Sequence, residues 1–445
     1  MKKFISLLLF SLLILSLVFS GGAKEESTEV KALGSEPVTI TFWHSASDEA
    51  GVLMDEFVRT FNETNPYQIT VKAIYQGQYS DATTLMKTVV SAENYKDLPD
   101  VMQLDATGKI DYYNSGKAFT VDDAISSFGE DISSLYVPLA LANWEFQGVK
   151  LGLPFATSTT ITFYNKSMLE KCGWDKCPDT FSDIVELKKD MEKNGIEAEA
   201  YGTVPNTPTL ANWLGQMGSY LVNNKNGSES MADKLECVDN GALLAFLKEW
   251  KTMYEEKGVA NRSLSTSQFV NEEVAIFTSS SSNVASVLEK VNGKFEVGTS
   301  TFLRVNDSAT YGATVSGSCL VMFDSGSDLR KKASWEFLKY LTGDEVQSTF
   351  AISTGYIPSS VGAIESDGYQ ALLKAKPQYA TAPEQLMATP KDMKSVTVGP
   401  SADFYYGIMN GVGDMLNNDV SPEKAAATMA SSLQALLDQY ARNNI

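Results

Sequence analysis

The segment that most constrains the fold reads Val38-Thr-Ile-Thr-Phe-Trp43, a run of β-branched and aromatic residues that is typical of a strand. A helix is predicted over residues 45–65, because Leu53, Phe57 and Phe61 recur on one helical face. The alternation continues with a strand at 69–75, a helix at 79–93 and a short buried strand at 100–105. Strands and helices in this order predict an α/β fold with a largely parallel sheet.

The same alternation resumes after Pro154 and continues toward the end of the chain. The predicted strands are 161–164, 273–277 and 318–323, and the predicted helices are 181–194, 241–256, 333–341 and 421–440. The sequence contains no repeat and no long stretch rich in proline or glycine that would separate independent domains. A chain of 445 residues is too long for one ordinary core, so two lobes within one folded unit are expected.

The composition is that of a folded, acidic protein. Hydrophobic residues make up 43% of the chain and charged residues 20%, which argues against a disordered chain. The formal net charge of -19 would repel nucleic acid and anionic lipid surfaces. Binding to nucleic acid is therefore not expected.

The amino-terminal segment has the pattern of a secretory signal peptide. A basic start precedes an apolar run at residues 4–19, and small residues follow it. The run is shorter than the roughly 20 residues that a membrane span needs. We predict a signal peptide over residues 1–20, with an uncleaved anchor as the alternative, and a disordered polar tether over residues 21–37. The first cysteine is Cys172, so no lipid-carrying cysteine follows the apolar run, and a free periplasmic protein is predicted.

The motifs of common enzyme classes are absent from the sequence. His44 is the single histidine, so a histidine-based catalytic triad or zinc site has few residues to draw on. The glycine-rich loops that bind nucleotides are missing as well. No cofactor and no metal site are predicted. The 55 Asp and Glu residues nevertheless leave a carboxylate-pair glycoside hydrolase open as an alternative.

The four cysteines are spaced unlike redox or zinc motifs. In an oxidising compartment, Cys172 and Cys177 could close a small loop through a disulfide. For Cys237 and Cys319, buried free thiols are an equally good interpretation.

Four segments together resemble the family of extracellular solute-binding proteins that serve ABC-type sugar importers. They read Ile40-Thr-Phe-Trp-His-Ser45, Leu98-Pro-Asp-Val-Met-Gln-Leu-Asp105, Leu153-Pro-Phe-Ala-Thr-Ser-Thr-Thr-Ile-Thr-Phe-Tyr-Asn-Lys166 and Thr354-Gly-Tyr-Ile-Pro358. Each segment alone is a weak signal, but the ordered set spans nearly all of the predicted mature chain. Within the family, the chain is most similar to members that bind glycerol 3-phosphate and more distantly similar to members that bind maltose.

The resemblance implies a two-lobed periplasmic-binding-protein fold of the α/β class, with a ligand cleft between the lobes and closure by hinge bending. One lobe would comprise residues 38–160 and 315–381, and the other residues 161–314 and 382–445. Three hinge crossovers are expected near residues 160–163, 314–317 and 382–393.

The resemblance also implies which residues contact the ligand. The positions that match contacting residues of the glycerol-phosphate-binding members are Tyr79, Ser158, Ser280 or Ser281, Gly317 and Tyr356. Where those members have a contacting glutamate, this chain has Ala106, directly after Asp105. Where they have a phosphate-binding arginine, it has Tyr405, a position that carries a sugar-stacking aromatic in maltose-binding members. Rings, hydroxyls and a carboxylate suit a neutral sugar better than a phosphate.

Several of these residues also have a purely structural interpretation. Asp105 could cap the end of a strand, and Tyr405 could pack into the core at the start of a helix. His44 is included as a ligand-binding candidate, although histidines more often pack and hydrogen-bond structurally. Trp43, Trp250 and Trp335 are expected in the core, whereas the pattern around Trp213 does not separate core from cleft.

We therefore predict the substrate-binding component of an ABC-type importer. The expected protein is a monomer and not an enzyme, and it binds a small carbohydrate and delivers it to the membrane permease subunits. A glycerol-phosphate or polyol binder of the same fold is the first alternative. A secreted glycoside hydrolase and a partner of a chemoreceptor or sensor kinase are alternatives from other classes.

Overall fold

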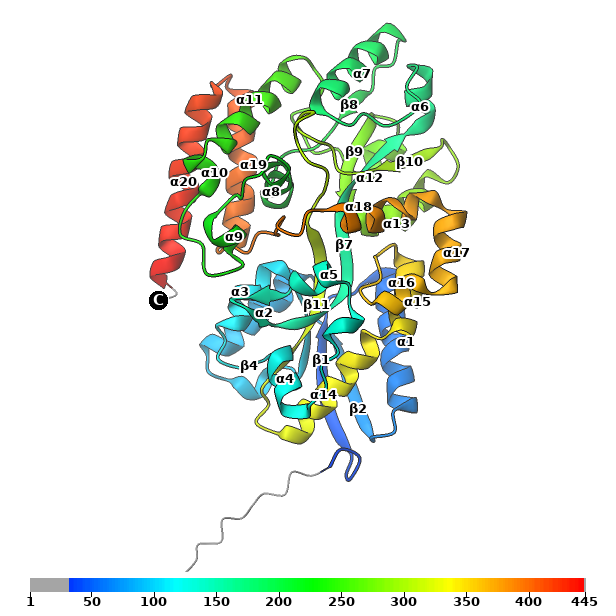
Figure 1. The fold of residues 1–445 in the computed structure, drawn as a ribbon, viewed down its shortest axis with the longest axis vertical. Helices are drawn as coiled ribbons and strands as arrows, with labels where there is room; N and C mark the ends of the chain where they lie inside the picture. The colour runs from blue at the N-terminus through cyan, green and yellow to red at the C-terminus, as the bar shows by residue number, and fades with distance from the viewer. Residues whose placement is uncertain (1–31, 444–445) are drawn as a thin grey trace, which may run out of the picture. The chain divides into compact units, whose positions relative to one another are not determined.

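Two sheet regions share one long strand, β7, which passes through the middle of the fold (Figure 1). The strands are β1 Val38–His44, β2 Ile69–Tyr75, β3 Val101–Asp105, β4 Ala118–Phe119, β5 Glu145–Phe146, β6 Val149–Lys150, β7 Gly152–Asn165, β8 Glu199–Tyr201, β9 Val274–Ser280, β10 Val297–Ser300 and β11 Val315–Phe323. The hydrogen-bonded order is β2-β1-β3-β11-β7-β9-β8, with β4 beside β11 and β10 beside β7. We call β1 to β4 and β11, with the first part of β7, the first sheet region. The second part of β7 with β8, β9 and β10 is the second sheet region. Strands β5 and β6 form a separate hairpin.

The length of β7 follows from its role in both sheet regions. Its residues 152–159 pair with β11, and its residues 160–165 pair with β9 and β10. The predicted strand at 161–164 is therefore only the second part of β7. Because β7 carries the chain from the first sheet region to the second and β11 carries it back, these neighbours run antiparallel.

The prediction of a largely parallel sheet is wrong. β1 pairs in parallel with β2 and β3, and β8 pairs in parallel with β9. The pairings that involve β11 or β10, and the pairing of β7 with β9, are antiparallel. The sheet is thus mixed, because two crossing strands are inserted between parallel units, while the α/β class is confirmed.

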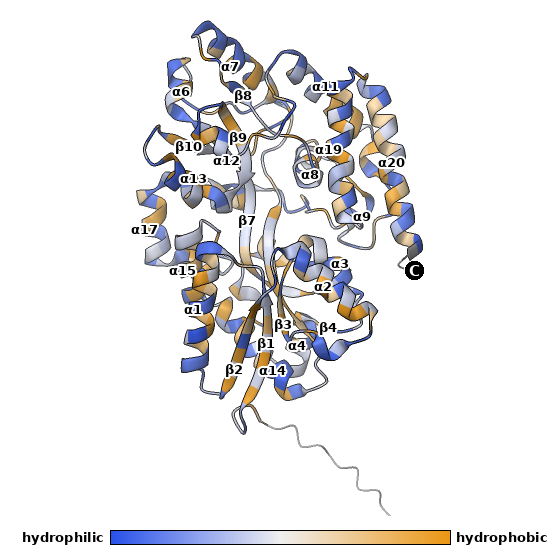
Figure 2. Ribbon diagram, turned by 180° about the vertical axis from the view of Figure 1, so that it is seen from behind, coloured by the Kyte–Doolittle hydropathy of each residue, from blue (hydrophilic) through white to orange (hydrophobic). Residues whose placement is uncertain are grey.

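Helices pack on both faces of the first sheet region. Residues of α1 and α14 share a hydrophobic core with Ile40 and Phe42 on one face of β1, and residues of α2 share another with Trp43 on the opposite face. In Figure 2, β1 and β2 are mainly hydrophobic, whereas the outer helix α1 carries many hydrophilic residues.

The α-helices are α1 Asp48–Thr64, α2 Tyr79–Ser91, α3 Lys109–Tyr113, α4 Val121–Phe128, α5 Pro138–Ala142, α6 Lys166–Lys171, α7 Phe181–Lys193, α8 Thr207–Gln216, α9 Asn223–Gly227, α10 Glu236–Asp239, α11 Ala242–Glu255, α12 Thr266–Val270, α13 Val284–Val291, α14 Asp328–Leu341, α15 Asp344–Thr354, α16 Val361–Glu365, α17 Asp367–Ala375, α18 Thr381–Ala388, α19 Ser401–Asn417 and α20 Pro422–Asn443. The 3-10 helices are η1 Tyr95–Asp97, η2 Ala106–Gly108, η3 Ser133–Leu135, η4 Ser281–Asn283 and η5 Pro377–Tyr379.

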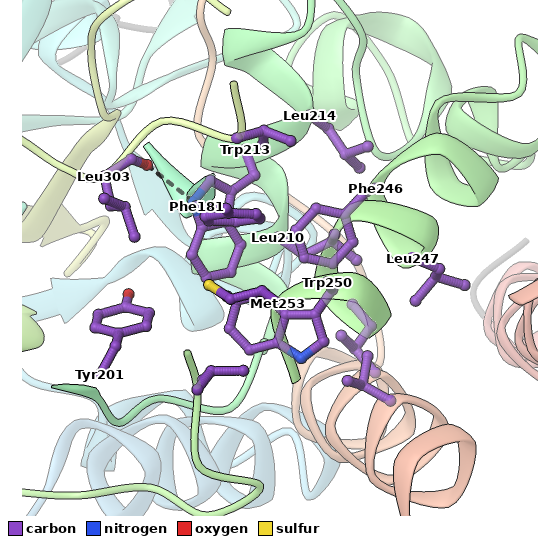
Figure 3. Close-up of a cluster of buried hydrophobic side chains, with 14 of the residues drawn as sticks. Phe181, Tyr201, Leu210, Trp213, Leu214, Phe246, Leu247, Trp250, Met253 and Leu303 are labelled. Carbon is purple, nitrogen blue, oxygen red and sulfur yellow. Dashed lines mark hydrogen bonds between the residues drawn. The ribbon is translucent and has the colours of Figure 1, made fainter. Parts of the chain in front are cut away.

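Residues of α7, α8 and α11 form an aromatic core (Figure 3). Trp213 is fully buried there, and its Nε1 donates a 3.0 Å hydrogen bond to the carbonyl oxygen of Leu303. Its ring centroid lies 5.3 Å from that of Phe246 and 5.2 Å from that of Trp250. These contacts place Trp213 in the core, which the sequence left undecided. Trp43, Trp250 and Trp335 are buried as predicted.

The structure is a computed structural model that describes residues 32–443. The predicted signal peptide at 1–20 and the predicted tether up to residue 31 lie outside the described residues. Leu33 packs against the core of the first sheet region, and Gln68 Nε2 donates a 2.9 Å hydrogen bond to the carbonyl oxygen of Gly34. The part of the predicted tether that begins at Leu33 therefore belongs to the folded unit. Within residues 32–443, no helix has both the length and the apolar character needed to cross a bilayer.

The cysteines are free thiols in this structure. Cys172, Cys177, Cys237 and Cys319 are all buried. Burial raises the pKa of the Cys237 thiol to about 12, so the thiol stays protonated at neutral pH.

Candidate functional site

A buried glutamine positions the first residue of α2. Gln103 Nε2 donates to the Tyr79 hydroxyl at 3.1 Å and to Ser318 Oγ at 2.9 Å. Its Oε1 accepts a 3.1 Å hydrogen bond from the backbone N–H of Ser45. Burial raises the pKa of Tyr79, so the phenol remains neutral. Gln103 thus holds side chains from α2 and β11 in one place.

Tyr356 connects Tyr79 and its hydrogen-bonded neighbours to the second sheet region. Its ring stacks on Phe350 with centroids 5.4 Å apart. Burial raises the pKa of Tyr356, and hydrogen bonding of its hydroxyl with the Ser282 and Tyr79 side chains opposes that shift. Ser282 follows β9, whereas Tyr79 begins α2, so the contact joins residues attached to different sheet regions. We call the four residues Tyr79, Ser282, Ser318 and Tyr356 the tyrosine–serine cluster.

Ser158 and Ser281 lie where β7 passes between the sheet regions. Ser158 is 3% exposed and pairs with Ser316 of β11. Ser281 is fully buried, and its Oγ accepts a 3.2 Å hydrogen bond from the backbone N–H of Thr159. Ser281 therefore ties the loop after β9 to the crossing strand, directly before Ser282.

Gly317 occupies a place on β11 that no other residue fits. Its φ is +104°, in the region that favours glycine. A Cβ at this position would lie 1.8 Å from the carbonyl oxygen of Ala156 and 3.3 Å from the backbone nitrogen of Ser158. The absence of a side chain here lets β7 and β11 approach next to Ser318.

Asp105 and Ser280 both have capping roles. Asp105 Oδ1 accepts 3.1 and 2.6 Å hydrogen bonds from the backbone N–H and the hydroxyl of Thr107, which caps η2. Burial raises the pKa of Asp105, and the hydrogen bonds from Thr107 oppose that shift. Asp105 lies opposite Ser318 in the β3–β11 pairing. Ser280 Oγ lies 2.9 Å from Ser282 Oγ and accepts from the Ser282 backbone N–H at 3.3 Å.

His44 makes no hydrogen bond or ring contact with the cluster among the described residues. It is 4% exposed at the end of β1, and its ring lies 5.5 Å from that of Phe42 and 5.9 Å from that of Tyr75. Burial lowers the pKa of His44, so the imidazole is neutral at pH 7. These contacts give His44 a packing role.

Tyr405 is the fifth residue of α19, near the start of a helix as the sequence suggested. Its hydroxyl accepts a 3.4 Å hydrogen bond from Asn206 Nδ2, and its ring packs at 5.4 Å against Tyr406. Asn206 follows β8, and Ser280 ends β9, the parallel neighbour of β8. Carboxyl ends of parallel strands meet at one sheet edge, so Tyr405 and the serines belong to the same edge. In the described part of the chain, no direct contact joins Tyr405 to the tyrosine–serine cluster.

The structure therefore brings most of the predicted residues together. Tyr79, Asp105, Ser158, Ser280, Ser281, Gly317 and Tyr356 lie in or beside the tyrosine–serine cluster. Neither His44 nor Tyr405 has a hydrogen bond or ring contact with the cluster among the described residues, and the Tyr405 hydroxyl is bonded to Asn206. The roles of these residues as ligand contacts stay predictions.

Sequence reasoning missed three residues of this region. Gln103 is a polar residue in the otherwise apolar run Val101 to Leu104, and this contrast was the available signal. Ser282 belongs to a run of four serines, in which nothing local distinguishes one hydroxyl from the next. Ser318 opens the apolar part of β11 and was predicted only as a strand residue.

The side chains that hydrogen-bond to the cluster are neutral. Among residues 32–443, neither lysine nor arginine hydrogen-bonds or pairs with the tyrosine–serine cluster, Asp105 or Tyr405. The described residues also hold no group of three or more His, Cys, Asp or Glu side chains that could bind a metal ion. The arrangement offers hydroxyls, amides and rings for hydrogen bonding and stacking.

Curated relatives of the chain bind glycerol 3-phosphate. The sn-glycerol-3-phosphate-binding periplasmic protein UgpB of Escherichia coli (strain K12) is 24% identical over 360 residues, covering 79% of this chain and 81% of the relative. UgpB of Yersinia pestis (strain Antiqua) is 25% identical over 361 residues with the same coverage.

Solved structures share the fold across most of the chain. UgpB from Mycobacterium tuberculosis in complex with glycerophosphocholine has a TM-score of 0.73 and 22% identity, covering 92% of this chain and 100% of that chain. The GacH receptor of Streptomyces glaucescens, studied with acarbose, has a TM-score of 0.72 and 19% identity, covering 91% and 99%. The cyclic alpha-maltosyl-1,6-maltose binding protein from Arthrobacter globiformis has a TM-score of 0.75 and 15% identity, covering 91% and 100%. These likenesses confirm the predicted two-lobed fold.

A family model adds direct evidence from the sequence. The model for bacterial extracellular solute-binding proteins matches residues 56–381, which is well over half of the chain. The match covers both crossing strands and the whole tyrosine–serine cluster. It confirms the predicted resemblance and the prediction of a solute-binding component. The chain belongs to the bacterial extracellular solute-binding protein family.

Proposed function

We propose that this protein binds a small neutral carbohydrate at the tyrosine–serine cluster and delivers it to the permease of an ABC-type importer. The observation that carries the proposal is the joining of hydroxyls from two sheet regions, Tyr79 and Ser318 with Tyr356 and Ser282. A sugar offers many hydroxyls, each able to donate and to accept, and neutral phenol and serine hydroxyls have the same capacity. Solved relatives that bind acarbose or maltosyl sugars support this choice.

The lack of a cation at the site favours a neutral ligand over a phosphate. Phosphate groups are commonly held by arginine in bidentate geometry or by lysine. The side chain expected to hold a phosphate is replaced by Tyr405, whose hydroxyl contacts an amide instead. The acidic chain, with a formal charge of -19, adds long-range repulsion of anions.

The same geometry supports a closure mechanism. Ser282 is attached to β9, and Tyr79 is attached to the segment after β2, so a ligand that contacts both would stabilise the arrangement that brings the lobes together. A ligand shifts such an equilibrium by its difference in affinity for the two arrangements. In this proposal the lobes follow the predicted division, 38–160 with 315–381 and 161–314 with 382–445.

A glycerophosphate is the second candidate ligand. The names of the curated UgpB relatives and the glycerophosphocholine complex of a solved relative favour it. Glycerol carries hydroxyls that the tyrosine–serine cluster would accept equally well, so the candidates differ in the phosphate alone.

We further propose that the protein is exported through its amino-terminal segment, acts in the periplasm as a monomer and has no catalytic activity. The relatives are named as binding proteins, and UgpB is named as periplasmic. The permease subunits of an importer would be its protein partners.

The proposal is tested by ligand-induced stabilisation of the purified chain. A ligand that binds only the folded state raises the unfolding temperature, and at 100 times its Kd it adds about 2.7 kcal/mol. We expect stabilisation by at least one mono- or oligosaccharide, and none by glycerophosphates. A panel in which glycerophosphates alone stabilise the chain favours the second candidate. Turnover of a chromogenic glycoside would contradict a binding protein without catalytic activity.

A further inference from the structure

A cavity of about 540 Å³ lies among α5, α16 and α18. Figure 1 shows these helices near the middle of the fold, where β7 and β11 cross. The cavity walls are mainly apolar and include Leu139, Ile357, Ile364, Leu386 and Met387. Small-molecule sites in proteins commonly have volumes of about 300–1,000 Å³ and apolar linings of this kind.

This cavity is separate from the candidate sugar site. None of the nine residues predicted to contact the sugar lines it. Thr157 lines the cavity, whereas Ser158 is the next residue of β7, and successive strand residues point to opposite faces. The backbone N–H of Ile357 donates to the carbonyl oxygen of Thr157 at 2.8 Å, which holds the cavity wall against the crossing strand.

The apolar lining is partly open to solvent. Met387 is 82% exposed and Val361 is 38% exposed, although both belong to the lining. Exposed apolar side chains gathered around a concavity mark a ligand or partner site more often than scattered ones do. Methionine adapts its shape readily to an apolar ligand.

Two lysines add a positive charge to this apolar site. Lys391 and Lys394 line the cavity, and neither side chain forms an ion pair or a hydrogen bond with any residue between 32 and 443. Glu365 is the one acidic residue of the lining. The lining is thus net positive in a chain whose formal charge is -19. This local reversal of charge favours an anionic group at the cavity.

We propose that the cavity binds a single-chain anionic amphiphile, a medium-chain fatty carboxylate, at a site separate from the sugar site. The acyl chain would occupy the space between Leu139, Ile364 and Leu386, and the carboxylate would pair with Lys391 and Lys394. A sugar does not suit this cavity, because the apolar walls leave most of its hydroxyls without partners. A fatty carboxylate satisfies both the apolar walls and the lysines.

Calorimetric titration with octanoate, decanoate and dodecanoate, kept below their micelle-forming concentrations, tests the proposal. Burying one methylene contributes about 0.8 kcal/mol, which corresponds to about fourfold in affinity, so decanoate should bind about 15-fold more tightly than octanoate. Affinity that does not change with chain length, or no binding of any of the three, overturns the proposal.

Variants separate the contributions of the charge and the apolar walls. The double substitution K391A/K394A should weaken decanoate binding about tenfold and leave decanol binding unchanged. The matched control is K374A, since Lys374 is an exposed lysine on α17 that does not line the cavity. The substitution I364W places a larger ring in the space proposed for the acyl chain and should weaken decanoate binding about tenfold or more, while sugar-induced stabilisation persists. An unchanged decanoate affinity in I364W, or an equal loss with K374A, places the amphiphile elsewhere and overturns the proposal.

Discussion

Gln103 Nε2 donates a 3.1 Å hydrogen bond to the Tyr79 hydroxyl, so a residue of β3 fixes the side chain that begins α2. Gln103 is 2% exposed, and all of its side-chain hydrogen bonds are made within the protein. The glutamine is therefore a positioning residue for the tyrosine–serine cluster and has no free group to offer to a ligand.

Substitution of this glutamine should weaken both folding and ligand binding. Q103L removes the hydrogen bonds to the Tyr79 and Ser318 hydroxyls and takes the acceptor away from the Ser45 N–H, and we expect a loss of about 1–3 kcal/mol in the free energy of unfolding. The matched control is Q347L, because Gln347 is equally buried and bonds to Ser359 outside the cluster. Urea unfolding should show similar losses for both variants, and titration with the sugar should show weaker binding for Q103L alone.

The hydroxyl of Tyr356 should contribute to ligand affinity. Y356F keeps the ring stacked on Phe350 but removes the group that bonds to Tyr79 and Ser282. Loss of one such hydrogen bond should weaken sugar binding about two- to tenfold. Y136F removes the buried hydroxyl that lies 2.7 Å from Thr342 Oγ1, away from the cluster. Sugar affinity that falls equally in both variants would show that the effect is not local.

Gly317 should tolerate no side chain. G317A adds a Cβ that meets the carbonyl oxygen of Ala156, and it also places alanine at a φ of +104°. G326A is the matched control, because Gly326 has a φ of +71° with no atom within 4 Å of its Cβ position. We expect a loss of about 1 kcal/mol for G326A and about 3 kcal/mol or more for G317A in urea unfolding. Equal losses would mean that backbone conformation, not the collision, limits residue 317.

Strands and helices whose own residues carry a clear periodicity or cap were predicted accurately from the sequence. The strand at 69–75 is β2 without change, and the helix at 181–194 is α7 to within one residue. Thr180 caps α7 by accepting a 3.3 Å hydrogen bond from the Asp183 N–H, and Ile184, Leu187 and Met191 bury its inner face. Periodicity and capping are local properties, so one sequence is enough to find them.

Features that depend on distant partners were harder to predict. The first part of β7 contains Pro154 and the polar run Thr157 to Thr160, which weakens a strand signal. Residues 152–159 form a strand because β11 pairs with them from more than 150 positions away, and Thr160 pairs with Ser280 of β9. Trp213 shows the same limit, since its burial depends on packing with Phe246 and Trp250. The grouping of the site residues came from the family resemblance, whereas Gln103 needed the structure.

Tyr405 should select the ligand. In the proposed function its ring stacks on the sugar, so Y405A should weaken sugar binding roughly tenfold. Y405R supplies the cation that the site lacks, and we expect stabilisation by glycerol 3-phosphate in thermal unfolding. The control is Y95A, since Tyr95 is 38% exposed and its ring contacts Lys117, not Tyr405. A wild-type sugar affinity in Y405A would remove Tyr405 from the proposed site without affecting the tyrosine–serine cluster.

Because Lys109 is buried, the free energy of unfolding should rise with pH in the alkaline range. Lys109 is 2% exposed, and its Nζ donates to the carbonyl oxygen of Asn143 at 2.7 Å and to Thr397 Oγ1 at 3.2 Å. Burial lowers the pKa of Lys109 to about 8 from an ordinary 10.5; Lys394 also lowers it, while Cys319 and Glu145 oppose the shift.

Between pH 8 and 10.5 the unfolded chain keeps a proton on this lysine that the folded chain has released. The free energy of unfolding therefore rises with pH in this window, and the penalty for burying the charge is fully present only below pH 8. A shift from 10.5 to about 8 corresponds to about 3 kcal/mol. The matched variant K109M has a side chain of similar length without the charge, so titration of the tyrosines and cysteines largely cancels in the difference. Urea unfolding at pH 7.5, 9 and 10.5 should show the wild type gaining up to about 3 kcal/mol relative to K109M, and a difference that does not change with pH would place the pKa of Lys109 near its ordinary value.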